Sequence, residues 1–222
     1  MPRRTFVKGA SAVGLGLALG VGNLLAITET PRRRRYPIAG VGSRSPMYPN
    51  AVETSHKDHA ELVAICDTNP GRLEISRDLA RSRGAAEPKA YAAADFDRMI
   101  AETKPDFVIV TTVDGNHHEY LVRAMELGCD TITEKPMTTT AAKCQAIVDA
   151  RKRTGKACRV LFNYRYSPPR TQVKDILMSG EIGDVLSVDF QWLLNTSHGA
   201  DYFRRWHSHK ENSGGLMVHK AT

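Results

Sequence analysis

The chain has 222 residues, of which 41% are hydrophobic and 25% are charged, a composition that can bury a core and fits one large or two small globular domains. Its net charge of +7 is concentrated at one end, because residues 1–35 carry seven basic side chains and one acid, Glu29. The remaining chain carries only +1 and has no basic stripe with interleaved aromatic residues, so nucleic acid is excluded as a partner.

Residues 1–30 have the layout of a secretory signal. A charged start that contains Arg3 and Arg4 precedes an uncharged stretch from Gly9 to Ile27, rich in Gly, Ala and Leu. The paired arginines resemble the twin-arginine signal, so we expect the twin-arginine machinery to export the protein to the periplasm or the cell exterior. The alternative is an uncleaved membrane anchor, because about 20 apolar residues can span a bilayer. Residues 31–35 are expected to form a basic linker.

From Tyr36 onward, short apolar runs alternate with longer amphipathic segments, which is typical of βαβ units and a parallel sheet. We expect a Rossmann domain, a doubly wound α/β fold, over residues 36–163. The predicted strands are 36–41, 62–66, 107–111, 131–133 and 159–162. The predicted helices are 72–83, 95–102, 117–127 and 140–153, and three of them precede a glycine suited to a left-handed C-cap, namely Gly84, Gly128 and Gly155.

The composition changes after Asn163. Pro168 and Pro169 open another predicted helix, which runs through Met178, and an alternating strand is predicted over residues 184–194. Alternation differs from the continuous apolar runs of buried parallel strands. We therefore expect residues 164–222 to be the start of a second α/β domain with an open mixed sheet, incomplete at its C-terminal end.

The run Gly40-Val41-Gly42-Ser43-Arg44-Ser45 follows the first predicted strand and precedes a predicted helix. Glycines at such a turn let the backbone approach a pyrophosphate, which then lies at the helix N-terminus. Ser45 replaces the third glycine of the G-x-G-x-x-G pattern, and the run alone is weak evidence for a nucleotide site. We predict that Gly40, Gly42, Ser43, Arg44 and Ser45 contact a dinucleotide cofactor.

Asp67 ends the second predicted strand, about 25 residues after the glycines and near the ~20 expected for a carboxylate that binds the adenosine ribose. Such a carboxylate repels a 2′-phosphate, so the predicted cofactor is NAD in preference to NADP, although the nearby Arg72 keeps NADP open. The alternative for Asp67 is a helix N-cap or turn residue.

Polar residues also follow the strand at 107–111, at the carboxyl end where open parallel sheets bind ligands. Thr111, Asn116 and His118 are therefore predicted to contact the nicotinamide ribose. The alternative is a polar loop in which Asn116 caps the next helix, and both interpretations can hold together.

Glu134-Lys135-Pro136 follows the next buried strand. A lysine at a strand tip is partly desolvated and near a cationic nicotinamide, and both effects lower its pKa and prepare it for proton exchange with a substrate hydroxyl. Pro136 fixes the local backbone, with a cis peptide as one option. Taken alone, this tripeptide would be better explained as a surface turn.

Residues 36–222 resemble the Gfo/Idh/MocA oxidoreductases in the order and spacing of six motifs: Gly40-x-Gly42, Asp67-x-Asn69, Glu134-Lys135-Pro136, Asn163-Tyr164-Arg165-Tyr166, Gly180-Glu181-Ile182-Gly183 and Ser213-Gly214-Gly215. The resemblance implies an N-terminal domain that binds NAD(P) and a C-terminal α/β domain whose open sheet makes the full-length protein a homo-oligomer. It also implies sugars, cyclitols or their derivatives as substrates.

The same resemblance assigns roles to individual residues. Lys135 matches the catalytic lysine of the family, and Glu134, Lys135 and Asn163 are expected beside the cofactor. Arg165 and Tyr166 are expected near the substrate.

The stretch from His198 to His207 resembles the subset of the family that includes NAD-dependent glycoside hydrolases, which oxidise a sugar hydroxyl transiently and eliminate the leaving group. This implies a catalytic role for Tyr202 and substrate contacts for Trp206 and His207, although the aromatic rings could equally fill a domain interface. His219 stands where many members have an aspartate and is expected to assist catalysis. Because the chain ends at Thr222, before the position of a second catalytic histidine, we expect an incomplete active site.

The sequence thus predicts an NAD-dependent oxidoreductase that transfers a hydride between NAD and a hydroxyl of a sugar or sugar derivative. Two alternatives stay open: an NAD-dependent glycoside hydrolase, and a non-catalytic NAD-binding protein or inactive fragment. No metal is expected, because the four cysteines form no C-x-x-C pair and the late histidines have no carboxylate or cysteine at ligand spacing.

Overall fold

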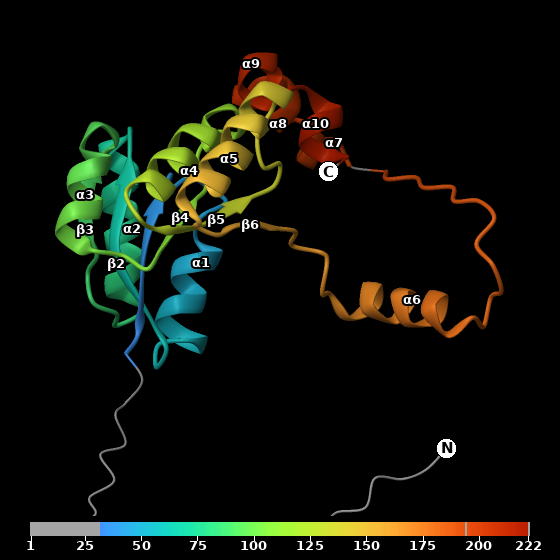
Figure 1. Ribbon diagram of the computed structural model, residues 1–222, viewed down its shortest axis with the longest axis horizontal. Helices are drawn as coiled ribbons and strands as arrows, with labels where there is room; N and C mark the ends of the chain where they lie inside the picture. Colours follow the sequence, from blue (N-terminus) through green and yellow to red (C-terminus); the bar gives the residue numbers. More distant parts are fainter. Residues whose placement is uncertain (1–31, 194, 222) are drawn as a thin grey trace, which may run out of the picture. The chain divides into compact units, whose positions relative to one another are not determined.

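The computed structural model describes residues 32–193 and 195–221, so the predicted export segment lies outside the described residues (Figure 1). Six parallel strands form one sheet in the order β3-β2-β1-β4-β5-β6. Their bounds are β1 Arg34–Ala39, β2 Ala60–Asp67, β3 Lys89–Ala92, β4 Phe107–Val110, β5 Asp130–Glu134 and β6 Cys158–Leu161. This strand order is that of the Rossmann fold, which confirms the predicted doubly wound parallel sheet.

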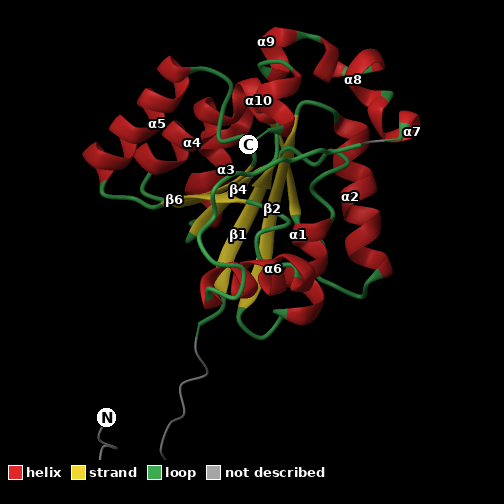
Figure 2. Ribbon diagram, turned by 90° about the vertical axis from the view of Figure 1, so that its right-hand side faces the viewer, coloured by secondary structure: helices red, strands yellow, loops and turns green. Residues whose placement is uncertain are grey.

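Helices cover both faces of the sheet (Figure 2). One face carries α1 (Met47–Asn50), which continues into the π-helical turn η1 (Ala51–Ser55), and α2 (Pro70–Ser82). The other face carries η2 (Ala93–Asp95), α3 (Phe96–Thr103), η3 (Asp114–Asn116), α4 (His117–Glu126) and α5 (Ala141–Thr154). The later residues form α6 (Pro168–Ser179), α7 (Thr196–Gly199), α8 (Asp201–Arg204), η4 (Trp206–Ser208), α9 (Lys210–Ser213) and α10 (Leu216–Lys220).

Local sequence determines where the longer helices begin and end. The Asn69 side chain accepts hydrogen bonds from the first N–H groups of α2, and Pro70 occupies the next position, where its missing N–H costs nothing. Thr140 caps α5 in the same way. Gly84, Gly128 and Gly155 all have positive φ angles near helix ends, as predicted.

The hydrophobic core has two layers, one on each face of the sheet, and β4 is buried between them. Val108 and Val110 pack with Leu121 of α4 on one face, whereas Ile109 packs with Leu73 of α2 on the other. Full burial of each such side chain stabilises the fold by about 1.5–3 kcal/mol. A strand covered on both faces explains why the sequence reads there as an uninterrupted apolar run.

Two predictions about element bounds were wrong. Arg34 and Arg35, assigned to the linker, begin β1, where Arg35 pairs with Glu61 of the adjacent strand. Residues 185–193 form no regular secondary structure, although a strand was predicted over 184–194. A strand needs a neighbour for its backbone groups, and all six strands of the described residues belong to the Rossmann sheet.

Within that described part of the chain, no helix is both long enough and apolar enough to cross a membrane.

Candidate active site

The glycine loop meets the loop that follows β4 at the point where the strand order reverses. Gly40 has φ +88°, and a Cβ at this position would lie only 2.6 Å from the backbone nitrogen of Thr112. The Thr111 hydroxyl donates a hydrogen bond to the Gly40 carbonyl oxygen. A Cβ on Gly42 would meet only the guanidinium of Arg72, at 3.9 Å. The first glycine is therefore required by the fold itself, whereas the second leaves the loop open towards a ligand.

Asp67 lies directly under this loop. One carboxylate oxygen accepts a hydrogen bond from the Val41 N–H and the other from the Asn69 N–H, both at 2.8 Å. The side chain thus stabilises the glycine loop and the start of α2. This is the role of a turn residue, the alternative that the sequence left open for Asp67. A carboxylate has about four acceptor positions, and within residues 32–193 and 195–221 the hydrogen bonds from Val41 and Asn69 are the two that Asp67 accepts, which leaves two positions for ribose hydroxyls.

The other loop residues divide into exposed and inward-facing ones. Ser43 and Arg44 are exposed, and in the described part of the chain their backbone N–H groups donate to no protein acceptor. Ser45 is buried, and both its N–H and its hydroxyl donate to the Gly42 carbonyl oxygen, at 3.1 and 2.9 Å. Ser45 therefore closes the turn, which accounts for a residue other than glycine at the third position of the motif.

Glu134 ties the glycine loop to the tip of β5. Its buried carboxylate accepts hydrogen bonds from the Tyr48 hydroxyl at 2.7 Å and from Arg44 Nε at 2.9 Å. Burial raises the pKa of Tyr48, and the Glu134 charge raises it further. The part played by Tyr48 was not predicted, because its partner lies 86 residues away. Glu134 consequently stabilises the predicted cofactor loop through its contacts with Arg44 and Tyr48.

We expect Glu134→Ala to destabilise the protein by roughly 1–3 kcal/mol, because it leaves the buried Tyr48 hydroxyl and Arg44 without their acceptor. Urea denaturation measures the loss. Glu119→Ala, at an exposed position of α4, is the matched control and should change stability by no more than about 0.5 kcal/mol. Equal losses in the two variants would show that the Glu134 contacts contribute nothing.

Lys135 stands at the tip of β5 and precedes Pro136 in a cis peptide, the option considered from the sequence. Its Nζ donates a hydrogen bond to the backbone oxygen of His219 at 2.6 Å. Burial lowers the pKa of the Lys135 amine and the Lys220 charge lowers it further, against the opposite effect of Asp114. The direction of the shift is the one expected for a lysine that exchanges protons.

Two histidines at the start of α4 behave differently. His117 is buried, and its ring nitrogens lie 2.9 Å from the Pro136 oxygen and 3.1 Å from the Thr112 oxygen, so it joins the loops after β4 and β5. This role was not predicted. His118 is half-buried, and burial lowers its pKa. Asn116 occupies the N-cap position of α4 but makes no side-chain capping hydrogen bond.

The C-terminal residues complete the surroundings of Lys135. His219 Nδ1 lies 2.5 Å from the Asp114 carboxylate, and the His219 ring centroid lies 5.4 Å from Tyr202 and 4.9 Å from His207. Trp206 stacks on His207 with centroids 3.6 Å apart. The structure therefore brings together five residues predicted to act in catalysis or substrate binding: Lys135, Tyr202, Trp206, His207 and His219.

Three predicted residues do not join this group. Asn163 is exposed, Tyr166 is 83% exposed, and Arg165 Nε donates to the Tyr166 hydroxyl. They lie in the segment between β6 and α7, whose large apolar side chains are exposed, as Leu186 is at 94%. Among the described residues this segment has no second sheet to pack against, so nothing orders Arg165 and Tyr166 towards Lys135.

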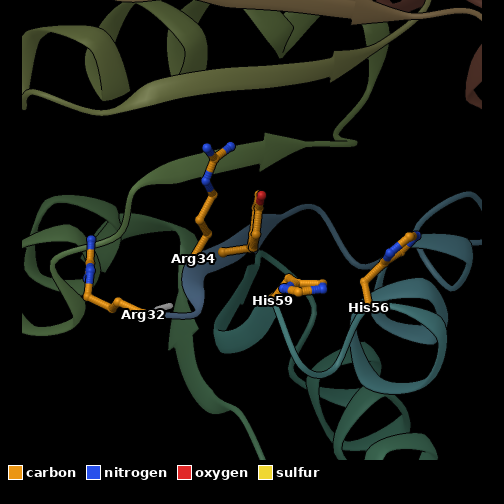
Figure 3. Close-up of a pocket in the computed structure, with 6 residues that line it drawn as sticks. Arg32, Arg34, His56 and His59 are labelled. Atoms are coloured by element: carbon orange, nitrogen blue, oxygen red, sulfur yellow. The ribbon is translucent and has the colours of Figure 1, made fainter. Parts of the chain in front are cut away.

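A separate hollow of about 360 Å³ lies beside the amino ends of β1 and β2 (Figure 3). It is lined by Arg32, Arg34, Tyr36, His56, His59 and Ala60. Open parallel sheets bind nucleotides at the carboxyl ends of their strands, so this hollow does not belong to the site around Lys135.

Residues 34–162 match the model of an oxidoreductase family with an NAD-binding Rossmann fold, and residues 174–222 match the model of the C-terminal α/β domain of the same family. The putative oxidoreductase YteT of Bacillus subtilis is 36% identical over 184 residues, which are 82% of this chain and 42% of YteT. A glycosyl hydrolase family 109 protein of Shewanella woodyi is 26% identical over 82% of this chain and 40% of its own length.

One similar solved structure is the WlbA dehydrogenase from Bordetella pertussis in complex with NADH and UDP-GlcNAcA. It has a TM-score of 0.60 and 28% identity, over 68% of this chain and 44% of WlbA. The chain thus spans less than half the length of these three proteins.

Proposed function

Because the chain belongs to the Gfo/Idh/MocA oxidoreductase family, whose NAD-binding model covers more than half of it, we propose that it transfers a hydride between NAD and a hydroxyl of a sugar or sugar derivative. One observation carries this proposal. The Gly40 loop, the Asp67 carboxylate and the Lys135 amine all lie along the carboxyl edge of a single parallel sheet, where such sheets bind dinucleotides.

The residues at this edge fit NAD. Gly42 leaves the loop open, and the backbone N–H groups of Ser43 and Arg44 are available to a diphosphate. Asp67 offers its remaining acceptor positions to ribose hydroxyls, and its negative charge disfavours the 2′-phosphate of NADP.

NAD, when bound, supplies the acceptor for a hydride from the carbon that carries the substrate hydroxyl. The chain's own part is to position that hydroxyl and to take its proton. Lys135 suits the second task, because its lowered pKa increases the neutral fraction of the amine and the His219 carbonyl fixes its Nζ. The rings of Tyr202 and Trp206 pack against the His219 ring, beside Lys135. Such aromatic rings suit the apolar face of a sugar ring.

The test is direct. Purified protein is denatured, any released nucleotide is identified, and NADH formation is then followed with a panel of cyclitols, sugars and nucleotide sugars. We expect NAD to raise the melting temperature more than NADP does, and NADH to form with at least one polyol. A protein that carries no dinucleotide and gains no stability from NAD would contradict the proposal. Binding without turnover would favour a non-catalytic NAD-binding protein.

The similarity to a glycosyl hydrolase family 109 protein over 82% of the chain favours one second candidate, a glycoside hydrolase with transient oxidation. In that reaction the hydride returns to the same sugar, so NAD is not consumed. Incubation with an aryl glycoside separates the two functions. Phenol release without accumulating NADH supports hydrolysis, whereas stoichiometric NADH supports a dehydrogenase.

We also propose that residues 1–30 direct export through the twin-arginine machinery and that the full-length protein assembles as a homo-oligomer. The arginine pair Arg3-Arg4 supports the first proposal, because it resembles the twin-arginine signal. This export route accepts folded proteins with cofactors already bound, as a protein that binds NAD would require. Fusion of residues 1–35 to a reporter tests it: Arg3→Lys combined with Arg4→Lys should abolish export, and unchanged export would contradict it. Light scattering tests the oligomer, and a monomeric mass would exclude it.

A further inference from the structure

A buried carboxylate and an imidazole meet beside Lys135 across 105 residues of chain. Asp114 opens η3 after β4, and His219 lies in α10. Their side chains are 6% and 12% exposed, and His219 Nδ1 lies 2.5 Å from Asp114 Oδ2. Because an ionised carboxylate can only accept, Nδ1 carries the hydrogen of this hydrogen bond.

Both partners are held from outside the pair. Gly115, next to Asp114, lies so close to α9 that a Cβ there would sit 2.6 Å from the Glu211 backbone oxygen. A Cβ on Gly214, just before α10, would meet Val218 at 2.9 Å and Thr139 at 3.1 Å. The turn that carries Asp114 therefore packs closely against the backbone of α9, and the residues that lead into the helix of His219 pack closely against the side chains of Val218 and Thr139.

The pair is also joined to the amine. Lys135 Nζ donates to the backbone oxygen of His219 at 2.6 Å, so the residue whose ring contacts Asp114 also holds Lys135 through its main chain. Aromatic rings of Tyr202 and Trp206 meet the His219 ring edge to face, with centroids 5.4 and 5.9 Å away. The imidazole thus has a defined orientation among groups that the proposed reaction uses.

We propose that Asp114 is a positioning residue that keeps His219 in the tautomer with its proton on Nδ1. Nε2 is then the acceptor nitrogen. It accepts a hydrogen bond from a hydroxyl next to the reacting one and so orients the substrate, which leaves the single proton of the reacting hydroxyl to Lys135. This inference rests on the proposed function. It differs from a purely structural pair because it predicts a loss of activity without unfolding when Asp114 is replaced.

Nitrogen-15 NMR of histidine-labelled full chain tests the tautomer, with Asp114→Ala and Asp114→Asn as variants. We expect wild-type His219 to be protonated on Nδ1. Asp114→Ala should shift the ring to the Nε2-protonated form, whereas the side-chain amide oxygen introduced by Asp114→Asn still accepts from Nδ1 and should preserve much of the native form. Asp149→Ala, an exposed aspartate of α5, is the matched control and should leave the His219 signal unchanged.

Turnover of the polyol oxidised fastest by the wild type gives the second readout. We expect kcat/KM to fall roughly ten- to hundredfold in Asp114→Ala, with NAD affinity unchanged within twofold, and to fall less in Asp114→Asn. Wild-type His219 protonated on Nε2, or an unchanged kcat/KM in a folded Asp114→Ala protein, would overturn the inference. If Asp114→Ala does not fold, the wild-type tautomer and the Asp114→Asn variant decide. A wild type that neither binds NAD nor oxidises any polyol overturns the proposed function instead.

Discussion

Lys135→Met is expected to lower NAD-dependent turnover by roughly 10²–10⁴-fold, the usual contribution of a positioned acid or base. Methionine retains the length of the side chain but removes the amine whose Nζ contacts the His219 carbonyl oxygen. Since the predicted pyrophosphate contacts lie in the Gly40 loop, NAD affinity should change by less than threefold. Initial rates of NADH formation and calorimetric titration with NAD measure the two quantities.

Lys152→Met, at an exposed position near the end of α5, is the matched control and should retain wild-type rates. If Lys135→Met keeps more than about a tenth of the wild-type rate, another group supplies the base. If instead it loses NAD binding, the lysine serves the cofactor rather than the substrate.

The pH dependence follows from the direction of the lysine shift. Lys135 accepts a proton only as the neutral amine, so the rate of hydroxyl oxidation should rise with pH through the pKa of this residue. Because burial lowers that pKa, the rise should occur below the range of about 10.4 that is usual for lysine. Rates measured across pH at saturating NAD test this, and the rise should be absent in Lys135→Met.

Much of the Rossmann domain could be predicted because its central strands are buried on both faces, which leaves uninterrupted apolar runs such as 107–110. β3 escaped prediction because Tyr91 is the only buried residue among its four. The predicted strand at 184–194 failed for a different reason. Its alternating pattern describes one covered face, but pairing depends on a neighbouring strand, which the local sequence does not reveal.

The same contrast holds for the site. Gly40, Asp67 and Lys135 could be assigned to one edge because the carboxyl ends of parallel strands lie together. The side-chain partners could not be assigned, since Tyr48 meets Glu134 and His219 meets Asp114 only after folding. Asp114 carried one usable signal, a carboxylate four residues after the end of a buried strand, which marks the same ligand-binding edge.

Gly40→Ala is expected to destabilise the protein by roughly 2–5 kcal/mol. Two effects add at this position. The left-handed backbone, with φ +88°, disfavours any Cβ, and the new atom would lie 2.6 Å from the Thr112 nitrogen and 2.7 Å from the Thr111 carbonyl carbon. These are backbone atoms at the end of β4, so the clash cannot be relieved by rotating a side chain.

Gly84→Ala separates the two effects, because Gly84 also has a positive φ, +68°, but a Cβ there would meet nothing within 4 Å. We expect this control to cost only about 1 kcal/mol, the backbone term alone, and to leave NAD affinity unchanged. Gly40→Ala should in addition weaken NAD binding at least tenfold, because the loop must move away from β4. Urea denaturation and NAD titration of both variants decide the matter: equal losses would mean that the glycine loop does not depend on its close approach to Thr112, and the proposed cofactor site would lose its structural basis.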